Sequence, residues 1–422
     1  MRTMVPLVTS ELPSDIGSAI RCAKAELRRR IGDVAAALAE VEEAMRTEVA
    51  AVIAERKAGR QLFPIVRFAD IAAGTVPEDA VASIRSRGCA VVRGTFSRAR
   101  AERWNGDLAA YLEDNDFARS YRGPADDVFG GLVSGQPQIY GVYWSKAQLE
   151  ARQDDNMVAV RSFLNSFWRH QSEGETWFDP TRDTAYPDRI RRRAPGSPSL
   201  GLSAHADNGS IERWLLPAYN RVFRHVLSGR WRDYDPWDAA YRTEVDEFPS
   251  TVMCSTFRTF QGWTALSEMQ PPDGVLHVVP IPQAMAYVLL RALQDDVAPD
   301  DLCGARNGQA LPISERWHSV LLPALCSIPA VEPGDSVWWH CDLIHSVADV
   351  STPERWGNVL YIPSAPLCEK NATYAAACGQ AFLAGESPRD FAPEHYEVSW
   401  RGRGTLADLS PVGRKQLGLE AW

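Results

Sequence analysis

The chain has 422 residues, of which 45% are apolar and 23% charged, and its formal net charge is −9. These values are typical of a globular protein with a sizeable core, and the negative charge argues against binding nucleic acid or an anionic membrane through bulk attraction. No apolar run reaches the ~18 residues that a spanning helix needs, the N-terminal residues lack the pattern of a signal peptide, and the eight cysteines form no CxxC pair. We therefore expect a cytoplasmic protein with reduced cysteines.

Residues 14–59 carry the clearest helical pattern. Ser14 is a candidate N-cap, and Gly59 marks the expected end. Because Gly32 interrupts the pattern, we interpret residues 1–60 as an N-terminal helical segment, one helix or a pair, that packs on the main domain. The alternative is a coiled-coil seam that makes the protein a homo-oligomer. Apolar residues recur every three or four positions on one stripe: Leu27, Ile31, Val34, Leu38, Val41, Met45 and Val49.

After residue 60, short runs rich in β-formers alternate with turn signals, and helical patterns lie between some of them. A capping box of Ser145 and Gln148 opens a predicted helix that runs to about Trp168, and further helices are expected at 211–228 and 283–294. We interpret residues 61–422 as one α+β domain with a many-stranded antiparallel core. The expected strands are 63–68, 88–96, 137–144, 200–206, 252–263, 274–280, 335–340 and 357–363.

His205 and Asp207 end one predicted strand. Residues i and i+2 of a strand point to the same face, so an imidazole and a carboxylate should project together, with a turn at Asn208-Gly209 just beyond. An HxD motif alone occurs often by chance, and an isolated buried histidine is more often a core residue than a ligand. The pair indicates a metal site only if a third ligand lies close to it in the fold.

The third ligand is expected in the segment 333–347, where a Pro-Gly-Asp turn precedes an aromatic strand and His345 follows a short corner. His340 competes with His345, and we prefer His345. Asp207 and His345 are 138 residues apart in sequence, so a barrel must bring their strands together. Two histidines and one carboxylate on one face of an ion are typical of non-haem Fe(II) oxygenases.

The combination of H205-A-D207, G334-D335, V337-W338-W339 and H345 resembles the double-stranded β-helix (jelly-roll or cupin-like) oxygenases that use 2-oxoglutarate, closest to the phytanoyl-CoA hydroxylase-like branch. The resemblance implies iron ligands at His205, Asp207 and His345. In that branch a basic residue about ten positions after the distal histidine binds the far carboxylate of 2-oxoglutarate. Arg355 has this spacing here. The loop after GVLHVVP departs from the branch's usual sequence, which puts the shape of the substrate pocket in doubt.

Across nearly its whole length the chain is also similar to the YbiU-like family of proteins, through the segments 189–214, 257–267 and 338–347. The expected function is a dioxygenase that hydroxylates a small polar metabolite with O₂ and releases succinate and CO₂. Two alternatives stay open: a non-catalytic β-barrel that binds a small ligand, and a zinc-dependent hydrolase with the same triad.

Several further residues are candidates for the pocket. Arg258 and Gln261, in FRTFQGW, are expected beside the co-substrate. If RIRRR at 189–193 is a strand, Arg189, Arg191 and Arg193 share a face and can clamp an anionic substrate, although a solvated or ion-paired face is the competing interpretation. Tyr140 and Trp144 are candidates for the pocket mouth.

Overall fold

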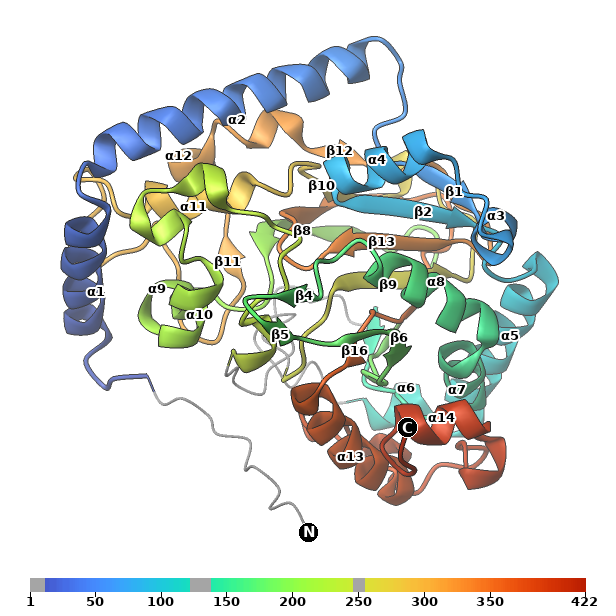
Figure 1. Cartoon of the computed structure of the whole chain (residues 1–422). Helices are drawn as coiled ribbons and strands as arrows, with labels where there is room; N and C mark the ends of the chain where they lie inside the picture. Colours follow the sequence, from blue (N-terminus) through green and yellow to red (C-terminus); the bar gives the residue numbers. More distant parts are fainter. Residues whose placement is uncertain (1–11, 122–137, 246–254) are drawn as a thin grey trace.

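The computed structural model describes residues 12–121, 138–245 and 255–422. The start of the strand predicted at 252–263 lies outside these ranges. Within them, two larger β-sheets pack against each other, and helices cover their outer sides (Figure 1). The described ranges contain no helix long and apolar enough to span a membrane. Because the described residues form helices as well as mainly antiparallel sheets, the predicted α+β class is confirmed for them.

The larger sheet carries the aromatic strand of the predicted site near its centre. All pairs in this sheet are antiparallel except β1 with β2. In spatial order its strands are β1 (Ile65–Arg67), β2 (Cys89–Arg93), β13 (Ser336–His340), β9 (Phe260–Ala265), β15 (Val359–Tyr361), β7 (Ile190–Arg191) and β3 (Ile139–Tyr140).

The smaller sheet carries both predicted histidine ligands, on neighbouring strands. All its pairs are antiparallel. In spatial order its strands are β11 (Leu311–Pro312), β8 (Ser199–Ala206), β14 (His345–Val350), β10 (Leu276–Val278) and β12 (Cys326–Ser327).

The chain passes back and forth between the two sheets. Strands β7, β9, β13 and β15 belong to the larger sheet, whereas β8, β10, β12 and β14, which come between them in sequence, belong to the smaller one. Two short antiparallel pairs lie outside these sheets: β6 (Asp179–Asp183) with β16 (Pro366–Leu367), and β4 (Gln171–Ser172) with β5 (Glu175–Thr176).

The larger sheet buries both of its faces. Val337 and Trp263 belong to a core cluster shared with the smaller sheet. Their strand neighbours Trp338 and Phe260 belong to a second cluster, together with side chains of the covering helices. Gly262 allows this packing, because a Cβ there would lie 2.4 Å from the Trp338 ring.

Helices occupy the outer sides of both sheets (Figure 1). The predicted helix at 145–168 is two helices, and the Ser145–Gln148 capping box is confirmed at the start of the first. Asp154 separates them because its backbone is extended and its side chain caps the second. The described helices after the N-terminal segment are α3 (Phe68–Ala73), α4 (Glu78–Arg87), α5 (Arg98–Asp114), α6 (Phe117–Ser120), α7 (Lys146–Gln153), α8 (Asp155–Asn165), α9 (Glu212–Leu215), α10 (Pro217–Val222), α11 (Ala284–Arg291), α12 (Glu315–His318), α13 (Glu369–Ala384) and α14 (Pro411–Gln416).

The N-terminal segment is a helix pair, α1 (Ile16–Ile31) and α2 (Val34–Lys57), that lies along the outside of the molecule (Figure 1). Asp15, rather than the predicted Ser14, caps α1, because its side chain accepts from the amide of Ser18. Gly32 makes the break, with a φ of 82° that glycine adopts without steric cost.

The predicted apolar stripe of this segment packs on the core cluster that also holds the smaller sheet. Leu27, Val41, Met45 and Val49 are buried in it, whereas Ile31, Val34 and Leu38 are only partly buried against it. In α1, the ammonium group of Lys24 donates to the carbonyls of Val297, Ala298 and Asp301. The division of the chain at residue 60 stays a prediction.

Candidate metal centre and pocket

The two histidines lie on adjacent strands, directly opposite each other. His345, the first residue of β14, pairs with His205 of β8. Two residues further along β14, Val347 pairs with Leu202, so β8 contains one extra residue here and forms a bulge. Gly201 lies beside the bulge with a φ of 71°.

The bulge corrects the predicted alternation of side chains along this strand. Strict alternation along β8 would place Leu202 and His205 on opposite faces, but both line the same pocket. The extra residue shifts the alternation between them. It leaves His205, Asp207 and the opposing strand in register.

The three predicted ligands converge. The distance from His205 Nε2 to Asp207 Oδ1 is 3.6 Å, and from His345 Nε2 to Asp207 Oδ2 it is 3.7 Å. The imidazole centroids are 4.2 Å apart, and one ligand atom from each residue lies within 4.8 Å of the others. Two atoms that each bind one ion at about 2.1 Å can be at most ~4.2 Å apart, so both carboxylate–imidazole distances suit a shared ion.

The imidazoles present the same nitrogen to the site. His205 Nδ1 lies 2.7 Å from Ser203 O, and His345 Nδ1 lies 3.0 Å from Leu343 O. A carbonyl can only accept, so each Nδ1 carries a proton, and in the neutral ring Nε2 is then the nitrogen that offers a lone pair. Burial, with a smaller effect of nearby His205, lowers the pKa of His345 to about 4, which keeps that ring neutral at pH 7.

The Asp207 carboxylate is held from the larger sheet. The Gln261 amide fits its neighbours when its nitrogen donates to Asp207 Oδ2 at 2.9 Å and its oxygen accepts from Trp339 Nε1 at 3.3 Å. Gln261 and Trp339 are themselves cross-strand partners of β9 and β13. The Trp339 ring lies 5.4 Å from that of His345. Both sheets therefore contribute to the arrangement of the three ligands.

The triad lines a cavity of about 940 Å³ between the sheets. Asp188 is paired with Arg189, and Asp390 accepts from Ser255. Among the described residues, the side chains of Arg191 and Arg389 form no hydrogen bond or ion pair. Besides the triad, the charged residues on the wall are Asp188, Arg189, Arg191, Arg258, Arg389 and Asp390.

Four of the predicted pocket residues line this cavity: Arg189, Arg191, Arg258 and Gln261. Arg258 donates to the side chain of Asn208 at 2.9 Å, next to the candidate ligand Asp207. Arg191 lies on β7 opposite Val359 of β15, and its charge acts on the Tyr361 hydroxyl, whose pKa is raised by burial.

Arg355 is not among the residues that line the cavity. It precedes β15, its side chain is 41% exposed, and its guanidinium lies 3.5 Å from Asp273 and 3.7 Å from Glu268. The ten-residue spacing after His345 therefore points to a residue in a loop, and its side chain contacts these two acids.

The other substrate candidates also lie outside the cavity lining. Arg193 is buried and donates to the carbonyls of Asp273 and Gly274. Trp144 is buried and donates to Glu386 O at 2.7 Å, and Tyr140 packs on Phe117 with ring centroids 5.2 Å apart. In each case the contacts described are with the protein's own chain.

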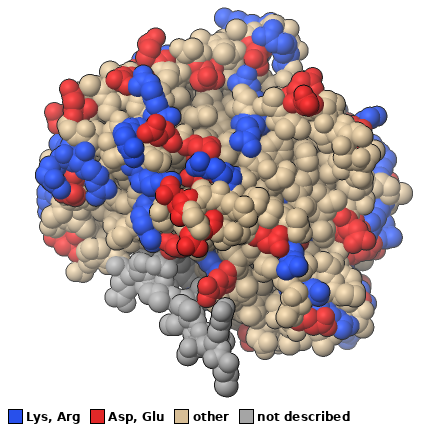
Figure 2. Space-filling view, viewed as in Figure 1, with Lys and Arg blue, Asp and Glu red and all other residues tan. Residues whose placement is uncertain are grey.

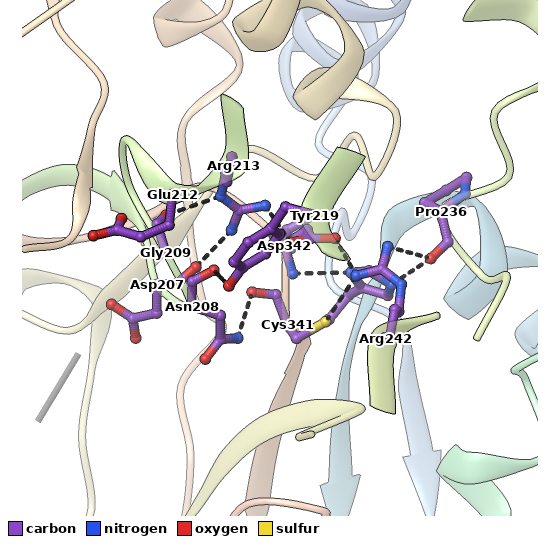
Figure 3. Close-up of polar contacts among 12 residues, drawn as sticks. Asp207, Asn208, Gly209, Glu212, Arg213, Tyr219, Pro236, Arg242, Cys341 and Asp342 are labelled. Carbon is purple, nitrogen blue, oxygen red and sulfur yellow. Dashed lines mark hydrogen bonds and ion pairs between the residues drawn. The ribbon is translucent and has the colours of Figure 1, made fainter. Parts of the chain in front are cut away.

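A second group of possible ligands consists of His340, Cys341 and Asp342. The imidazole and the carboxylate of this group already make hydrogen bonds within the protein. Both carboxylate oxygens of Asp342 bind arginines, at 2.9 Å from Arg213 and 2.7 Å from Arg242 (Figure 3). His340 accepts from the amide of Asp342 and its other nitrogen lies 3.0 Å from Pro236 O. The preference for His345 over His340 therefore agrees with the geometry.

Sequence reasoning missed two kinds of residue. Trp339 could have been found, because strand alternation in SVWWH separates it from Trp338 and His340 and places it on the inner face. Arg213 gave no signal, since its carboxylate partner is 129 residues away.

The outer surface gives no sign of a dominant charge on the face viewed in Figure 2. Basic and acidic side chains lie next to one another there rather than in separate areas.

Comparison with known proteins places this architecture in a family. The model of the Gig2-like family matches residues 12–419. The chain belongs to the Gig2-like family. The Escherichia coli (strain K12) protein YbiU is 51% identical over 420 residues, which cover 99% of this chain and 100% of YbiU. The YbiU-like resemblance noted in the sequence is thereby confirmed.

Two solved structures extend the likeness to three dimensions. The "Putative Oxidoreductase" from Salmonella typhimurium LT2 is 50% identical with a TM-score of 0.94, over 98% of this chain and 100% of that one. GlcNAc Inducible Gene 2 from Candida albicans is 26% identical with a TM-score of 0.78, over 98% and 91% of the two chains. The Gig2-like fold thus includes the N-terminal helices as well as both sheets.

Proposed function

We propose that this Gig2-like protein is a non-haem Fe(II)- and 2-oxoglutarate-dependent dioxygenase. The observation that carries the proposal is the convergence of His205, Asp207 and His345 at one end of a large cavity. Two neutral imidazole nitrogens and one carboxylate oxygen are a donor set that suits ferrous iron, and their placement leaves the cavity side open for other ligands.

The strand order supports the same class. From β7 to β15 the chain alternates between the two sheets, apart from β10, β11 and β12, which all belong to the smaller one. Alternation of this kind is typical of jelly rolls, where two sheets form one double-stranded β-helix. The HxD motif ends the second strand of this series, and the distal histidine opens the second-last strand. We therefore propose a double-stranded β-helix core, which brings ligands 138 residues apart in sequence to one site.

Arg191 is the residue that we assign to the far carboxylate of 2-oxoglutarate. It lines the cavity, is partly buried, and makes no ion pair with the described residues. A guanidinium can grip a carboxylate through two parallel hydrogen bonds. Arg355 is already engaged with two acids outside the cavity lining. Arg258, which donates to Asn208, then lies between the ligand turn and the cavity.

When bound, Fe(II) and 2-oxoglutarate supply an O₂-dependent oxidation in which 2-oxoglutarate yields succinate and CO₂ and the substrate gains an oxygen atom. The protein's part is positional. Ser203 O and Leu343 O fix the two rings through their Nδ1 protons, and Gln261 fixes the carboxylate of Asp207. The arginines on the wall and the volume of about 940 Å³ suit a small polar or anionic metabolite as substrate.

The test is the binding of both components without O₂. Fe(II) and 2-oxoglutarate added anaerobically to the wild type should give a weak visible charge-transfer band, because 2-oxoglutarate binds to the ferrous ion that the protein holds. His205→Ala should abolish the band. His277→Ala is the matched control, since His277 is a partly buried histidine of β10 that does not line the cavity.

Absence of the band from the folded wild type would contradict the proposal. Activity that persists without O₂ and requires Zn²⁺ would favour a hydrolase, and binding of 2-oxoglutarate without succinate formation in air would favour a non-catalytic binding protein.

A further inference from the structure

A buried ion-pair network lies directly beneath the metal ligands. The Asp342 carboxylate lies between the guanidinium groups of Arg213 and Arg242, and all three side chains are buried (Figure 3). Burial opposes ionisation of Asp342, but the two arginines outweigh it and hold its pKa below the usual range. Removal of one partner from such a network leaves a buried charge without compensation.

Arg213 joins this network to the backbone that carries Asp207. Its Nη2 donates to Asp207 O at 2.7 Å and its Nε donates to Gly209 O at 2.9 Å, while Nη1 donates to Asp342. The hydroxyl of Tyr219 donates to Asn208 O, the carbonyl between these two. Side chains therefore hold three consecutive carbonyls of the turn after β8.

The turn uses residues suited to its backbone angles. Asn208 and Gly209 both have positive φ, 63° and 99°, a region that glycine adopts without steric cost and that asparagine tolerates. A Cβ at position 209 would lie 2.6 Å from the Tyr219 hydroxyl. The two residues after Asp207 therefore adopt left-handed backbone angles, and the Tyr219 hydroxyl packs closely against the second of them.

The same arginine also reaches the segment that carries the other ligand. Asp342 comes three residues before His345, and Leu343 O, the carbonyl next to Asp342, orients the His345 ring. Arg213 is therefore a direct bridge between the chain segments that supply Asp207 and His345. Arg242 shares the Asp342 carboxylate and also donates to Cys341 Sγ at 3.9 Å, but its backbone contacts are with Asp238 and Pro236, and no contact described for it reaches residues 207–209.

We propose that Arg213 is a positioning residue for the metal centre: by bridging Asp207 O, Gly209 O and Asp342, it sets the distance between the carboxylate ligand and the imidazole of His345. The inference rests on the proposed metal-binding function. Removal of the groups that orient ligands typically lowers metal affinity about 10- to 100-fold, and we expect a loss in this range for Arg213→Met.

The experiment compares Arg213→Met with Arg242→Met by Co²⁺ titration of the metal-free proteins. The two variants are matched, because each removes one of the two arginines from the same buried carboxylate, and only Arg213 contacts the turn. Absorption bands of bound Co²⁺ report both affinity and coordination geometry. Thermal unfolding of the metal-free proteins reports the structural cost separately.

We expect both variants to unfold at lower temperature, but only Arg213→Met to bind Co²⁺ about 10- to 100-fold more weakly and with altered bands. Equal affinity in the wild type and a folded Arg213→Met variant would overturn the inference, as would equal losses in both variants.

If Arg213→Met does not fold, Arg213→Lys takes its place, because lysine keeps the charge beside Asp342 but cannot make the three-way bridge. Unchanged Co²⁺ affinity in Arg213→Lys, or a loss equal to that in Arg242→Met, would then overturn the inference. Failure of the wild type itself to bind Co²⁺ would contradict the proposed function, and with it this inference.

Discussion

Replacement of Arg191 with methionine tests which arginine receives the far carboxylate of 2-oxoglutarate. Methionine keeps much of the volume and removes the charge and all the donors. Arg355→Met is the matched comparison, because the resemblance to phytanoyl-type enzymes points to Arg355 and the cavity lining points to Arg191. Both side chains are partly exposed, so neither change creates a buried cavity.

The expected magnitude follows from the contacts. A hydrogen-bonded pair that involves a charged group contributes about 1.5–3 kcal/mol. Since 1.4 kcal/mol corresponds to a factor of ten, loss of the pair should weaken 2-oxoglutarate binding about 10- to 150-fold. Arg355 makes two ion pairs at 3.5 and 3.7 Å outside the cavity lining, so its removal should change the affinity less than about 3-fold.

The assay is an anaerobic titration of the Fe(II)-loaded protein with 2-oxoglutarate, followed by the charge-transfer band at constant ionic strength. It measures affinity without turnover and needs no substrate. A weaker affinity in Arg355→Met together with an unchanged affinity in Arg191→Met would refute our reasoning and show that the loop before β15 turns inward when the co-substrate binds.

Three further results are expected. Gln261→Leu should lower Co²⁺ affinity about 10- to 100-fold because the Asp207 carboxylate loses its donor, whereas Gln309→Leu, elsewhere on the cavity wall, should not; equal affinities by titration would count against a role for Gln261. Leu164→Ala, at a fully buried position of α8, should lower the free energy of unfolding in urea by about 2–5 kcal/mol, and Leu383→Ala, at a 44% exposed position, by less than about 0.5 kcal/mol. Burial raises the pKa of Glu397 to about 7, so as pH rises the unfolded chain loses this proton before the folded one does, and the stability of the metal-free protein should fall by up to ~3 kcal/mol between pH ~4.3 and ~7. In urea unfolding at the same pH values, the stability of Glu397→Gln should depend less on pH than that of the wild type. Parallel curves for the two proteins would contradict this prediction.

The sequence was informative where a local pattern has a fixed geometric meaning. The i and i+2 spacing of His205 and Asp207 on a strand predicted two side chains that point the same way, and they lie 3.6 Å apart. The Ser145–Gln148 capping box likewise predicted the start of α7. Such patterns need only neighbours in sequence, so a single chain reveals them.

Features that depend on contacts across the fold were not readable. The bulge in β8 depends on pairing with β14, and it places Leu202 in the same pocket as His205, which strict alternation along the strand would not do. Arg355 had the expected spacing, but acids from a different part of the chain bind it. For Arg213, nothing near it in sequence indicated that its guanidinium would bridge two ligand-bearing segments.

The buried lysine of the first helix bears on how this protein can be shortened. Lys24 donates to three carbonyls in the stretch from Val297 to Asp301, and a few residues later this stretch becomes the cavity wall at residues 307–310. A version that starts after residue 60 would release those carbonyls to water and uncover apolar side chains of the smaller sheet. Removal of the first two helices should therefore loosen the cavity wall as well as lower the stability of the protein.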